Sequence, residues 1–343
     1  MISSENKKNE LFIKNRSLAN KLRRIFAAMV TDNKKAALLY EGLRDFEPWL
    51  LDIMREGLAD LGGRPPDFWQ AAAGRLTDAG ASGAANMLRE IPKFYLQDDD
   101  WQTPTLRCLA ELFLLVQAAK NSDKLSETLG NELLVTAGIT IKSSSLLENK
   151  DANFAEIVDT WQVLGEKSGK TIDDALQYRR TWLRGKTNGL YAVFLDYDFS
   201  NKGYKTNYTV GTEWQGDLVF YPANAGLRAF EKTKQAPPFK RFETTFAYAN
   251  FSEFQEAVAK QTAAAPWLKA MPCTLQEATP YFYQKKHYLI DCQGFMLPLS
   301  IKEMPFWKLL AISGNAPITV FGEWVYDKFE PLSGFSAGQW IAF

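Results

Sequence analysis

The sequence of 343 residues has few of the side chains on which most metal and catalytic sites depend. It contains one histidine, His287, and three cysteines, Cys108, Cys273 and Cys292. One imidazole excludes every metal site built on two histidines, and the cysteines form no Cys-x-x-Cys pair. We therefore predict no metal site. The odd number of scattered thiols also argues against a disulfide framework and favours a reducing compartment.

The surroundings of these residues favour structural roles. His287 lies in QKKHYLIDC, between two lysines and an apolar segment, and we interpret it as a surface or strand-edge residue. The alternative is a proton switch, or a nucleophile pair with the nearby Cys292. Cys108 shares an apolar helical face with Leu109 and Phe113, which indicates a place in the core.

Motifs for nucleotides and acyl transfer are also missing. The chain has no Gly-x-x-x-x-Gly-Lys-Ser/Thr loop, no strand-linked Gly-x-Gly-x-x-Gly and no Gly-x-Ser-x-Gly elbow. We therefore predict no cofactor and no enzyme activity.

Long apolar runs and an excess of charge are absent as well. No stretch reaches the roughly 18 apolar residues that span a bilayer, and the segment MISSENKKNELFIKN lacks the apolar centre of a signal peptide. We expect a cytoplasmic protein without membrane contact. Lys plus Arg total 40 and Asp plus Glu total 40, whereas dedicated nucleic-acid binders usually carry a basic excess.

The positive charge is nevertheless concentrated at the N-terminus. Residues 1–35 hold nine Lys or Arg and three Asp or Glu, and Arg23 and Arg24 are our candidates for interaction there. Three interpretations stay open: a solvated helix face, a contact with nucleic-acid phosphates, and a docking site for an acidic partner.

Aromatic residues are abundant, at 13% of the chain, so a large core can form. Five tryptophans keep helical apolar spacing and are predicted to be core residues: Trp49, Trp69, Trp101, Trp161 and Trp182. Trp214 and Trp324 each follow a glutamate close to a glycine, as at strand ends. They are candidate contact residues for a partner, with plain packing as the alternative.

The spacing of apolar residues predicts an α+β protein with two domains. Residues 1–150 form an all-helical domain, with helices over 3–30, 33–61 (kinked or restarted at Pro48), 68–79, 83–91, 103–116 and 123–134. Residues 151–343 form a mixed domain with a mainly antiparallel sheet. We predict its helices at 154–164, 172–183, 251–265 and 302–312, and its strands at 190–199, 215–221, 287–292, 294–299, 317–321 and 329–332.

Three carboxylates form the one candidate for metal chemistry. Asp196 and Asp198 alternate along a predicted strand and share a face, and Asp217 lies on another strand. Together they could hold Mg²⁺ for phosphodiester chemistry. The alternative is a solvent-exposed face that ends in the turn SNKG.

Several long motifs, in the same order, resemble bacterial SWIM zinc-finger proteins in the region that follows the finger. The first is LRDFEPWLLDIMREGLADLGGRPPDFWQAAAGRLTDAGASGAANMLREI at 43–91. The others are GTEWQGDLVFYPANAGLRAF at 211–230, PWL at 266–268, WKLLAISGNAPITVFGEW at 307–324 and FEPLS at 329–333. The resemblance spans most of residues 15–340.

The finger itself, Cys-x-Cys followed by Cys-x-His, is absent, so no zinc ligand is carried over. Genes of this family typically lie near those of MoxR-type AAA+ ATPases and von Willebrand factor A-domain proteins. The resemblance implies a bacterial, non-enzymatic adaptor whose partner is one of those proteins. The alternative is a nucleic-acid-binding protein that uses the basic N-terminal helix.

Overall fold

The computed structural model describes residues 33–343 except for 98–99, 149–155, 172–175, 199–202, 205–206, 223 and 234–238. The basic segment predicted as a helix over 3–30, with Arg23 and Arg24, lies outside the described residues. The described chain divides into a helical unit and a strand-rich unit, which we call the β unit. The α+β class is confirmed: helices come first, and antiparallel sheets with two helices follow.

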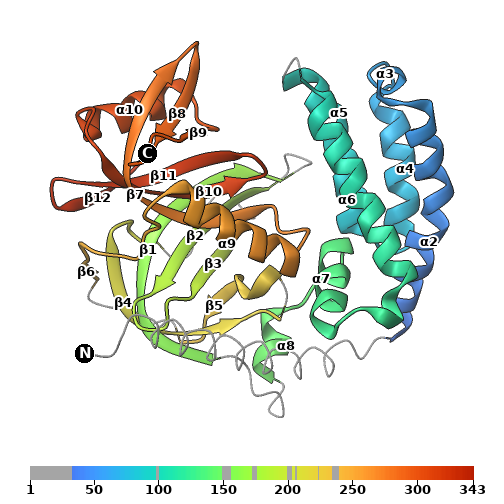
Figure 1. The fold of residues 1–343 in the computed structure, drawn as a ribbon. Coiled ribbons are helices and arrows are strands. Elements are labelled where there is room, and N and C mark those ends of the chain that lie inside the picture. The colour runs from blue at the N-terminus through green and yellow to red at the C-terminus, as the bar shows by residue number, and fades with distance from the viewer. Residues whose placement is uncertain are drawn as a thin grey trace. The chain divides into compact units, whose positions relative to one another are not determined.

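The helical unit contains four longer helices and several short ones (Figure 1). The longer helices are α2 (Asn33–Glu56), α4 (Pro66–Asp78), α5 (Ser82–Gln97) and α6 (Gln102–Lys120). The others are α3 (Leu58–Leu61), a 3₁₀ turn at Ser122–Lys124, α7 (Glu127–Ala137) and α8 (Ser143–Glu148).

Of the two alternatives predicted at Pro48, a kink or a restart of the helix, the structure excludes the restart. Helix α2 runs unbroken to Glu56 with Pro48 inside it, and the chain leaves the helix at Gly57, whose φ is 86°. Proline removes one hydrogen bond from a helix, but Phe46 and Leu50 on either side are buried, so packing holds the helix together. Gly57 breaks it because glycine adopts positive φ without a side-chain clash.

For two other helices the predicted start lies within two residues of the observed one. Helix α4 begins at Pro66, two residues before the predicted start at 68, and proline fits there because a first-turn residue needs no amide hydrogen. Helix α6 begins at Gln102, one residue before the predicted start at 103. The Asp100 carboxylate accepts hydrogen bonds from the Thr103 amide and hydroxyl, at 3.3 and 2.9 Å. An acidic side chain therefore caps this end.

Polar side chains of α2 bind the last turn of α6. The Arg44 guanidinium donates to the Ala119 carbonyl, at 3.1 and 3.3 Å. The Glu47 carboxylate accepts from Gln117 at 2.7 Å and pairs with Lys120 at 2.8 Å. Carbonyls at a helix C-terminus lack partners inside the helix, so Arg44 supplies one that holds α6 against α2.

A glycine permits the closest approach within this unit. A Cβ on Gly83, in the first turn of α5, would lie 2.1 Å from the Thr136 carbonyl oxygen of α7. A Cβ on Gly74 in α4 would meet nothing within 4 Å. The two positions therefore separate the packing effect of a methyl group from its effect on helix propensity.

We predict that Gly83→Ala lowers the free energy of unfolding by about 1–3 kcal/mol, because the backbone of α7 must move. Gly74→Ala is the matched control and should raise it by up to about 1 kcal/mol, since alanine favours the helix. Urea denaturation followed by circular dichroism measures both. Equal effects of the two changes would contradict the close contact of α5 with α7.

The β unit contains two six-stranded sheets and two helices (Figure 1). The first sheet has the order β3-β2-β1-β4-β5, with β6 also paired to β4, and the second has the order β12-β11-β10-β7-β8-β9. Every pairing between these strands is antiparallel. The first-sheet strands are β1 (Glu156–Lys170), β2 (Gln177–Gly185), β3 (Tyr191–Asp198), β4 (Thr212–Phe220), β5 (Ala229–Glu231) and β6 (Lys240–Arg241). The second-sheet strands are β7 (Ala270–Tyr283), β8 (Lys286–Ile290), β9 (Met296–Pro298), β10 (Ile318–Val325), β11 (Lys328–Ser336) and β12 (Gln339–Ala342).

The helices that we predicted over 154–164 and 172–183 are wrong for the described residues, which form strands β1 from Glu156 and β2 from Gln177. Strand β1 lies between β2 and β4, and its register shifts between Val163 and Gly165. The five consecutive residues 161–165 are all buried. A central strand with a bulge loses the strict alternation of a half-exposed strand, so its apolar spacing imitated a helix.

The second sheet has a separate core on each of its faces. Leu164 and Trp182 of the first sheet pack with Phe321 and Leu332 of the second. On the other face, residues of β7, β8 and β10 pack with α9 (Phe251–Ala264) and α10 (Glu303–Ser313). The β unit is therefore layered, with the second sheet between the first sheet and the helices.

One fully buried carboxylate of the second sheet is hydrogen-bonded to side chains of the first sheet. Glu323 of β10 is 0% exposed and accepts hydrogen bonds from Arg180 at 2.6 Å and from the Trp182 indole at 2.7 Å. Lys167 lies 3.5 Å from the same carboxylate and also pairs with Glu330. A buried charge is tolerated only with such partners, so these bonds fix how the sheets face each other.

We predict that Glu323→Leu lowers the free energy of unfolding by about 3–5 kcal/mol, because it leaves the Arg180 charge without its partner. Glu330→Gln should cost about 1 kcal/mol or less, since its pair with Lys167 is partly solvated. Urea titration of both variants tests the difference. The account fails if the two substitutions cost the same.

Candidate interaction surface

Trp214, one of the two tryptophans predicted as contact residues, lies inside the β unit. It is 2% exposed, and its indole packs against Tyr208 and Phe239 with ring centroids 5.0 and 6.0 Å away. Its Nε1 donates to Glu231 at 3.2 Å. The structure therefore agrees with the packing alternative and leaves Trp214 unavailable to a partner.

Trp324 also packs inward. Its ring meets Phe254 of α9 edge to face, with centroids 5.6 Å apart, and it lies partly buried against the helix-side core. Of the tryptophans predicted as core residues, Trp69, Trp161 and Trp182 are buried, although the last two lie on strands.

The three carboxylates of the magnesium hypothesis do not meet. Strands β3 and β4 are separated in the sheet by β2 and β1, which places them about 14 Å apart at the usual strand spacing. Asp196 pairs with Arg179 at 3.2 Å, and Asp198 accepts the Gly203 amide at 3.0 Å. The hypothesis of a magnesium site at Asp196, Asp198 and Asp217 is therefore contradicted, because it required β3 and β4 to be neighbours. In the described part of the chain, no cluster of three or more His, Cys, Asp or Glu side chains could hold a metal ion.

Asp217 instead lies beside a second carboxylate. Burial and the neighbouring Glu156 raise the pKa of Asp217 to about 6. The hydrogen bond from Lys232, at 2.6 Å, lowers the pKa of Glu156. Protonated Asp217 is thus favoured in the folded state. The stability that protonated Asp217 contributes to the fold is fully present below pH 3.8, the ordinary pKa of aspartate. It is lost as the pH rises through about 6, the pKa of Asp217 in the folded protein.

We predict that Asp217→Asn gains stability relative to the unaltered protein as the pH rises from about 4 to about 7, because the amide cannot ionise. Urea denaturation at a series of pH values gives the difference between the two proteins. A difference that stays constant across this range would show that Asp217 titrates normally.

His287 packs against aromatic rings, and two of the three cysteines are buried. The His287 ring lies on Phe306, with centroids 4.2 Å apart, and near Phe282 at 5.3 Å. Cys108 is buried, as predicted, and its thiol donates to the Met87 carbonyl at 3.1 Å. Cys273 is buried and Cys292 is exposed. No described helix combines the length and the apolar character that a membrane span requires.

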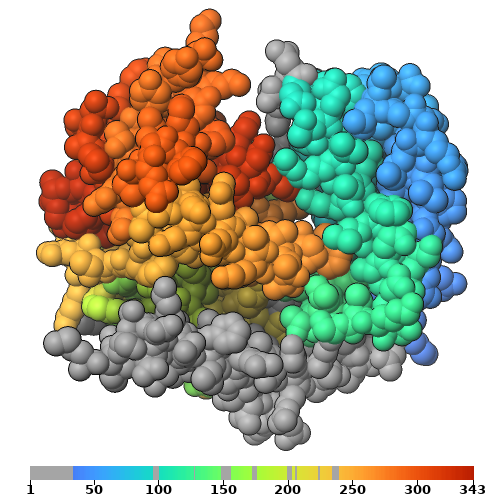
Figure 2. Space-filling view, viewed as in Figure 1, coloured from blue at the N-terminus to red at the C-terminus, as the bar shows by residue number. Residues whose placement is uncertain are grey.

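A group of exposed aromatic side chains lies at the turn between β7 and β8. Gln284 and Lys285 form this turn, with φ values of 47° and 62°. Positive φ at both positions is typical of the tight turn that matches strand twist. The hairpin projects from its unit at the top of the view (Figure 1), and Figure 2 shows its tip standing clear of the surrounding atoms.

Both faces of this hairpin carry aromatic rings. Tyr281 and Tyr283 point to one side and stack on each other, with centroids 6.2 Å apart. Phe282 points to the other side, is 47% exposed and lies 6.0 Å from Trp307 of α10. Met304, one helical turn before Trp307, is 78% exposed. We call these five residues the hairpin surface.

Phe282 and Trp307 of the hairpin surface rest on a buried aromatic residue. Phe306 is completely buried and contacts Phe282, Trp307 and His287, with ring centroids 4.2–6.3 Å away. Aromatic anchors held in place lose little conformational entropy when they bind. Contiguous exposed apolar groups are uncommon on proteins that act alone and often mark an interface.

Unpaired positive charge borders this surface. Lys285 and Lys286 at the turn and Lys302 before α10 make no ion pair within the described part of the chain. Sequence reasoning missed the hairpin surface because it treated QKKHYLIDC only as the context of His287. The available signal was the run Tyr-Phe-Tyr directly before a turn.

The comparisons with known proteins identify one region of the chain. Residues 34–136 match the SWIM-associated four-helix bundle domain, from the second residue of α2 to the last but one of α7. This agrees with the resemblance of residues 43–91 to proteins with SWIM zinc fingers. No curated protein and no solved structure matches the chain.

Proposed function

We propose that this chain, whose residues 34–136 form a SWIM-associated four-helix bundle domain, is a non-enzymatic adaptor that binds a partner protein through its hairpin surface. The single observation that carries the proposal is the cluster of exposed, well-supported aromatic side chains on β7 and α10. Tryptophan, tyrosine, phenylalanine and methionine are enriched at protein interfaces, where a few such anchors supply most of the affinity.

The charge beside these anchors favours an acidic partner surface. Lys285, Lys286 and Lys302 lie close to the aromatic residues in sequence, and complementary charge speeds association and selects the orientation of the partner. The resemblance of the sequence to SWIM-containing proteins supports a MoxR-type AAA+ ATPase or a von Willebrand factor A-domain protein as that partner. The scarcity of histidine and the missing nucleotide motifs support a role without catalysis.

We predict that Phe282→Ala and Trp307→Ala each weaken binding to the partner by about 30-fold or more, the loss typical of a central aromatic anchor. Binding of the full chain to a purified MoxR-type ATPase or A-domain protein of the same organism can be measured by calorimetry. Stability should fall by about 1–2 kcal/mol, because the exposed fractions of 47% for Phe282 and 43% for Trp307 leave part of each side chain packed on the protein.

Phe295→Ala is the matched control. Phe295 is 60% exposed but lies after β8, at the end of that strand away from the turn, so its loss should leave binding unchanged.

Binding that survives both hairpin substitutions would refute the role of this surface. Duplex DNA binding that falls steeply with salt and disappears on changing Arg23 and Arg24 to Glu would instead support the nucleic-acid alternative.

A further inference from the structure

The hairpin of β7 and β8 extends past the strand that pairs with β7 on its other side. Strand β10 pairs with β7 only as far as Ala278, which lies opposite Ile318. The remaining residues of β7, 279–283, pair with β8 on one side. On the other side, no described strand pairs with them. This part of β7 therefore has an open side, which we call the β7 edge.

The pairing of β8 shows which backbone groups face the β7 edge. The His287 carbonyl accepts the Leu299 amide at 2.9 Å, and Leu299 follows β9, on the side of β8 away from β7. In an antiparallel pair, successive residues alternate between bonding to one neighbour and to the other, so Phe282, opposite His287, does not bond to β8. The amide and the carbonyl of Phe282 therefore point out of the β7 edge.

Pro280 agrees with this orientation. Proline has no amide hydrogen for a neighbouring strand, so within a sheet it is confined to places where that hydrogen would point away from the ladder. Pro280 lies opposite Leu289 and two residues before Phe282, so its backbone faces the same way as that of Phe282. The β7 edge thus presents one amide and two carbonyls without a backbone partner among the described residues.

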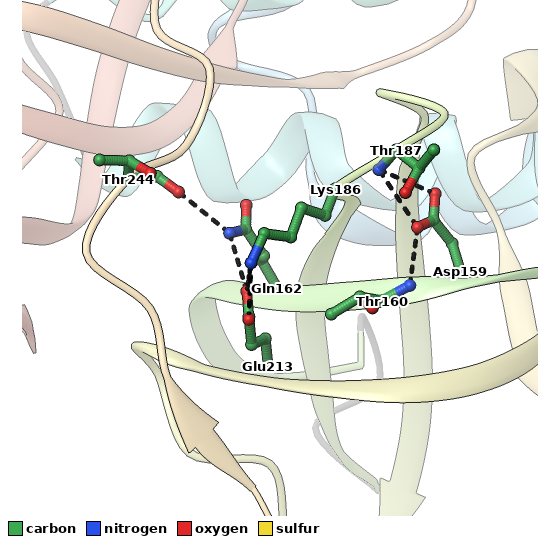
Figure 3. A network of polar contacts seen from close by, with 7 residues as sticks. All are labelled: Asp159, Thr160, Gln162, Lys186, Thr187, Glu213 and Thr244. Atoms are coloured by element: carbon green, nitrogen blue, oxygen red, sulfur yellow. Dashed lines mark hydrogen bonds and ion pairs between the residues drawn. The ribbon is translucent and has the colours of Figure 1, made fainter.

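Backbone groups next to the strands of the first sheet are, by contrast, bound by side chains (Figure 3). The Asp159 carboxylate accepts the Thr187 amide at 3.1 Å, in the turn that follows β2. The Gln162 side chain donates to the Thr244 carbonyl at 3.0 Å. No described side chain bonds to the backbone groups of the β7 edge, so they are left for water or for another molecule.

The side chains on both faces of the hairpin suit an added strand. Phe282 and His287 share one face, with ring centroids 5.3 Å apart, and Trp307 lies 6.0 Å from Phe282. Tyr281 and Tyr283 share the other face. Cross-strand contacts of aromatic residues with apolar ones stabilise a strand pair. A strand beside β7 would therefore gain contacts as well as backbone hydrogen bonds.

We propose that the partner protein adds an extended segment to the β7 edge as a further antiparallel strand, an inference that rests on the adaptor function proposed above. One residue of the segment, opposite Phe282, exchanges both backbone hydrogen bonds with it, and a second residue donates to the Pro280 carbonyl. An open edge is a ready template for pairing with another chain.

The charge at the turn determines the chemistry of this segment. Lys285 and Lys286 are exposed and lie where the β7 edge ends. Complementary charge fixes the register and orientation of a bound segment. The segment is therefore apolar opposite Phe282, where it meets the aromatic rings, and carries Asp or Glu where it passes the turn.

Replacement of the Phe282 amide by an ester tests the pairing. Incorporation of 3-phenyllactic acid at position 282 removes the N–H group and keeps the ring. Binding to the purified MoxR-type ATPase or A-domain protein should weaken about 3–10-fold, the loss typical of one hydrogen bond. The thermal unfolding temperature should stay the same, because this amide has no described partner in the free chain.

The same ester at position 246 is the matched control. Phe246 is also a half-exposed phenylalanine whose amide has no described backbone partner. It lies near Tyr248, which forms a bridge with Leu275, away from the tip of the hairpin. This ester should leave binding unchanged, and equal losses from the two esters would overturn the proposal.

Phe282→Ala separates this inference from the adaptor proposal. Weaker binding of Phe282→Ala, with unchanged binding of the ester at position 282, would overturn strand addition alone. Unchanged binding of both, or no binding by the unaltered chain, would overturn the adaptor proposal and strand addition with it. A dimer of this chain that dissociates on introducing the ester, measured by sedimentation, would assign the β7 edge to a second copy and overturn the partner segment.

Amide hydrogen exchange at single residues tests the pairing without a substitution. In the free chain, the Phe282 amide should exchange at least tenfold faster than the amides of Tyr281 and Tyr283, which bond to β8. The partner should slow the Phe282 amide to the rate of these neighbours. A Phe282 amide that is already slow in the free chain, or that stays fast in the complex, would overturn the proposal.

Discussion

The architecture of the β unit depends on a carboxylate that has no contact with solvent. Glu323 is stable inside the protein only because Arg180 and Trp182 of the opposite sheet donate to it. A slip of β10 by one residue would turn Glu323 to the other face and leave Glu323 and Arg180 without each other as partners. The bond therefore selects one register for β10, and β7 pairs directly with β10. Through β7, the same constraint determines where the hairpin projects.

Exposure rather than aromatic content separates the candidate surface from the core. Trp214 and Phe282 are both large aromatic residues of this unit. Trp214 is buried, with a hydrogen bond and packed aromatic neighbours, whereas Phe282 is half exposed. Leaving Phe282, Trp307 and Met304 in water forgoes the free energy that their burial would provide. Such an exposed apolar surface is expected where a second molecule binds and buries it. The exposure of these side chains therefore supports the proposed interaction role.

Local features of the fold could be predicted from the sequence, whereas features set by distant contacts could not. The start of α4 at Pro66, the end of α3 before Gly62 and the core position of Trp69 each follow from neighbouring residues. The strands over 156–170 and 177–185 could not be recognised, because a central position and a bulge removed their alternation.

The sites show the same division. Whether Asp196 and Asp217 lie close together depends on the order of the strands in the sheet. The spacing of residues along the sequence does not reveal that order. The hairpin surface is defined by exposure, which is a property of the folded structure. The sequence did predict correctly that Cys108 is buried, because helical spacing alone placed it on an apolar face.

The central claim is that this chain binds its partner through the β7–β8 hairpin and α10. Hydrogen–deuterium exchange of the full chain, with and without a purified MoxR-type ATPase or A-domain protein, tests it most directly. The account predicts slower exchange in residues 279–288 and 303–310 when the partner is present. Slower exchange confined to the helices of residues 34–136 or to residues 1–32, with the hairpin unchanged, would contradict it.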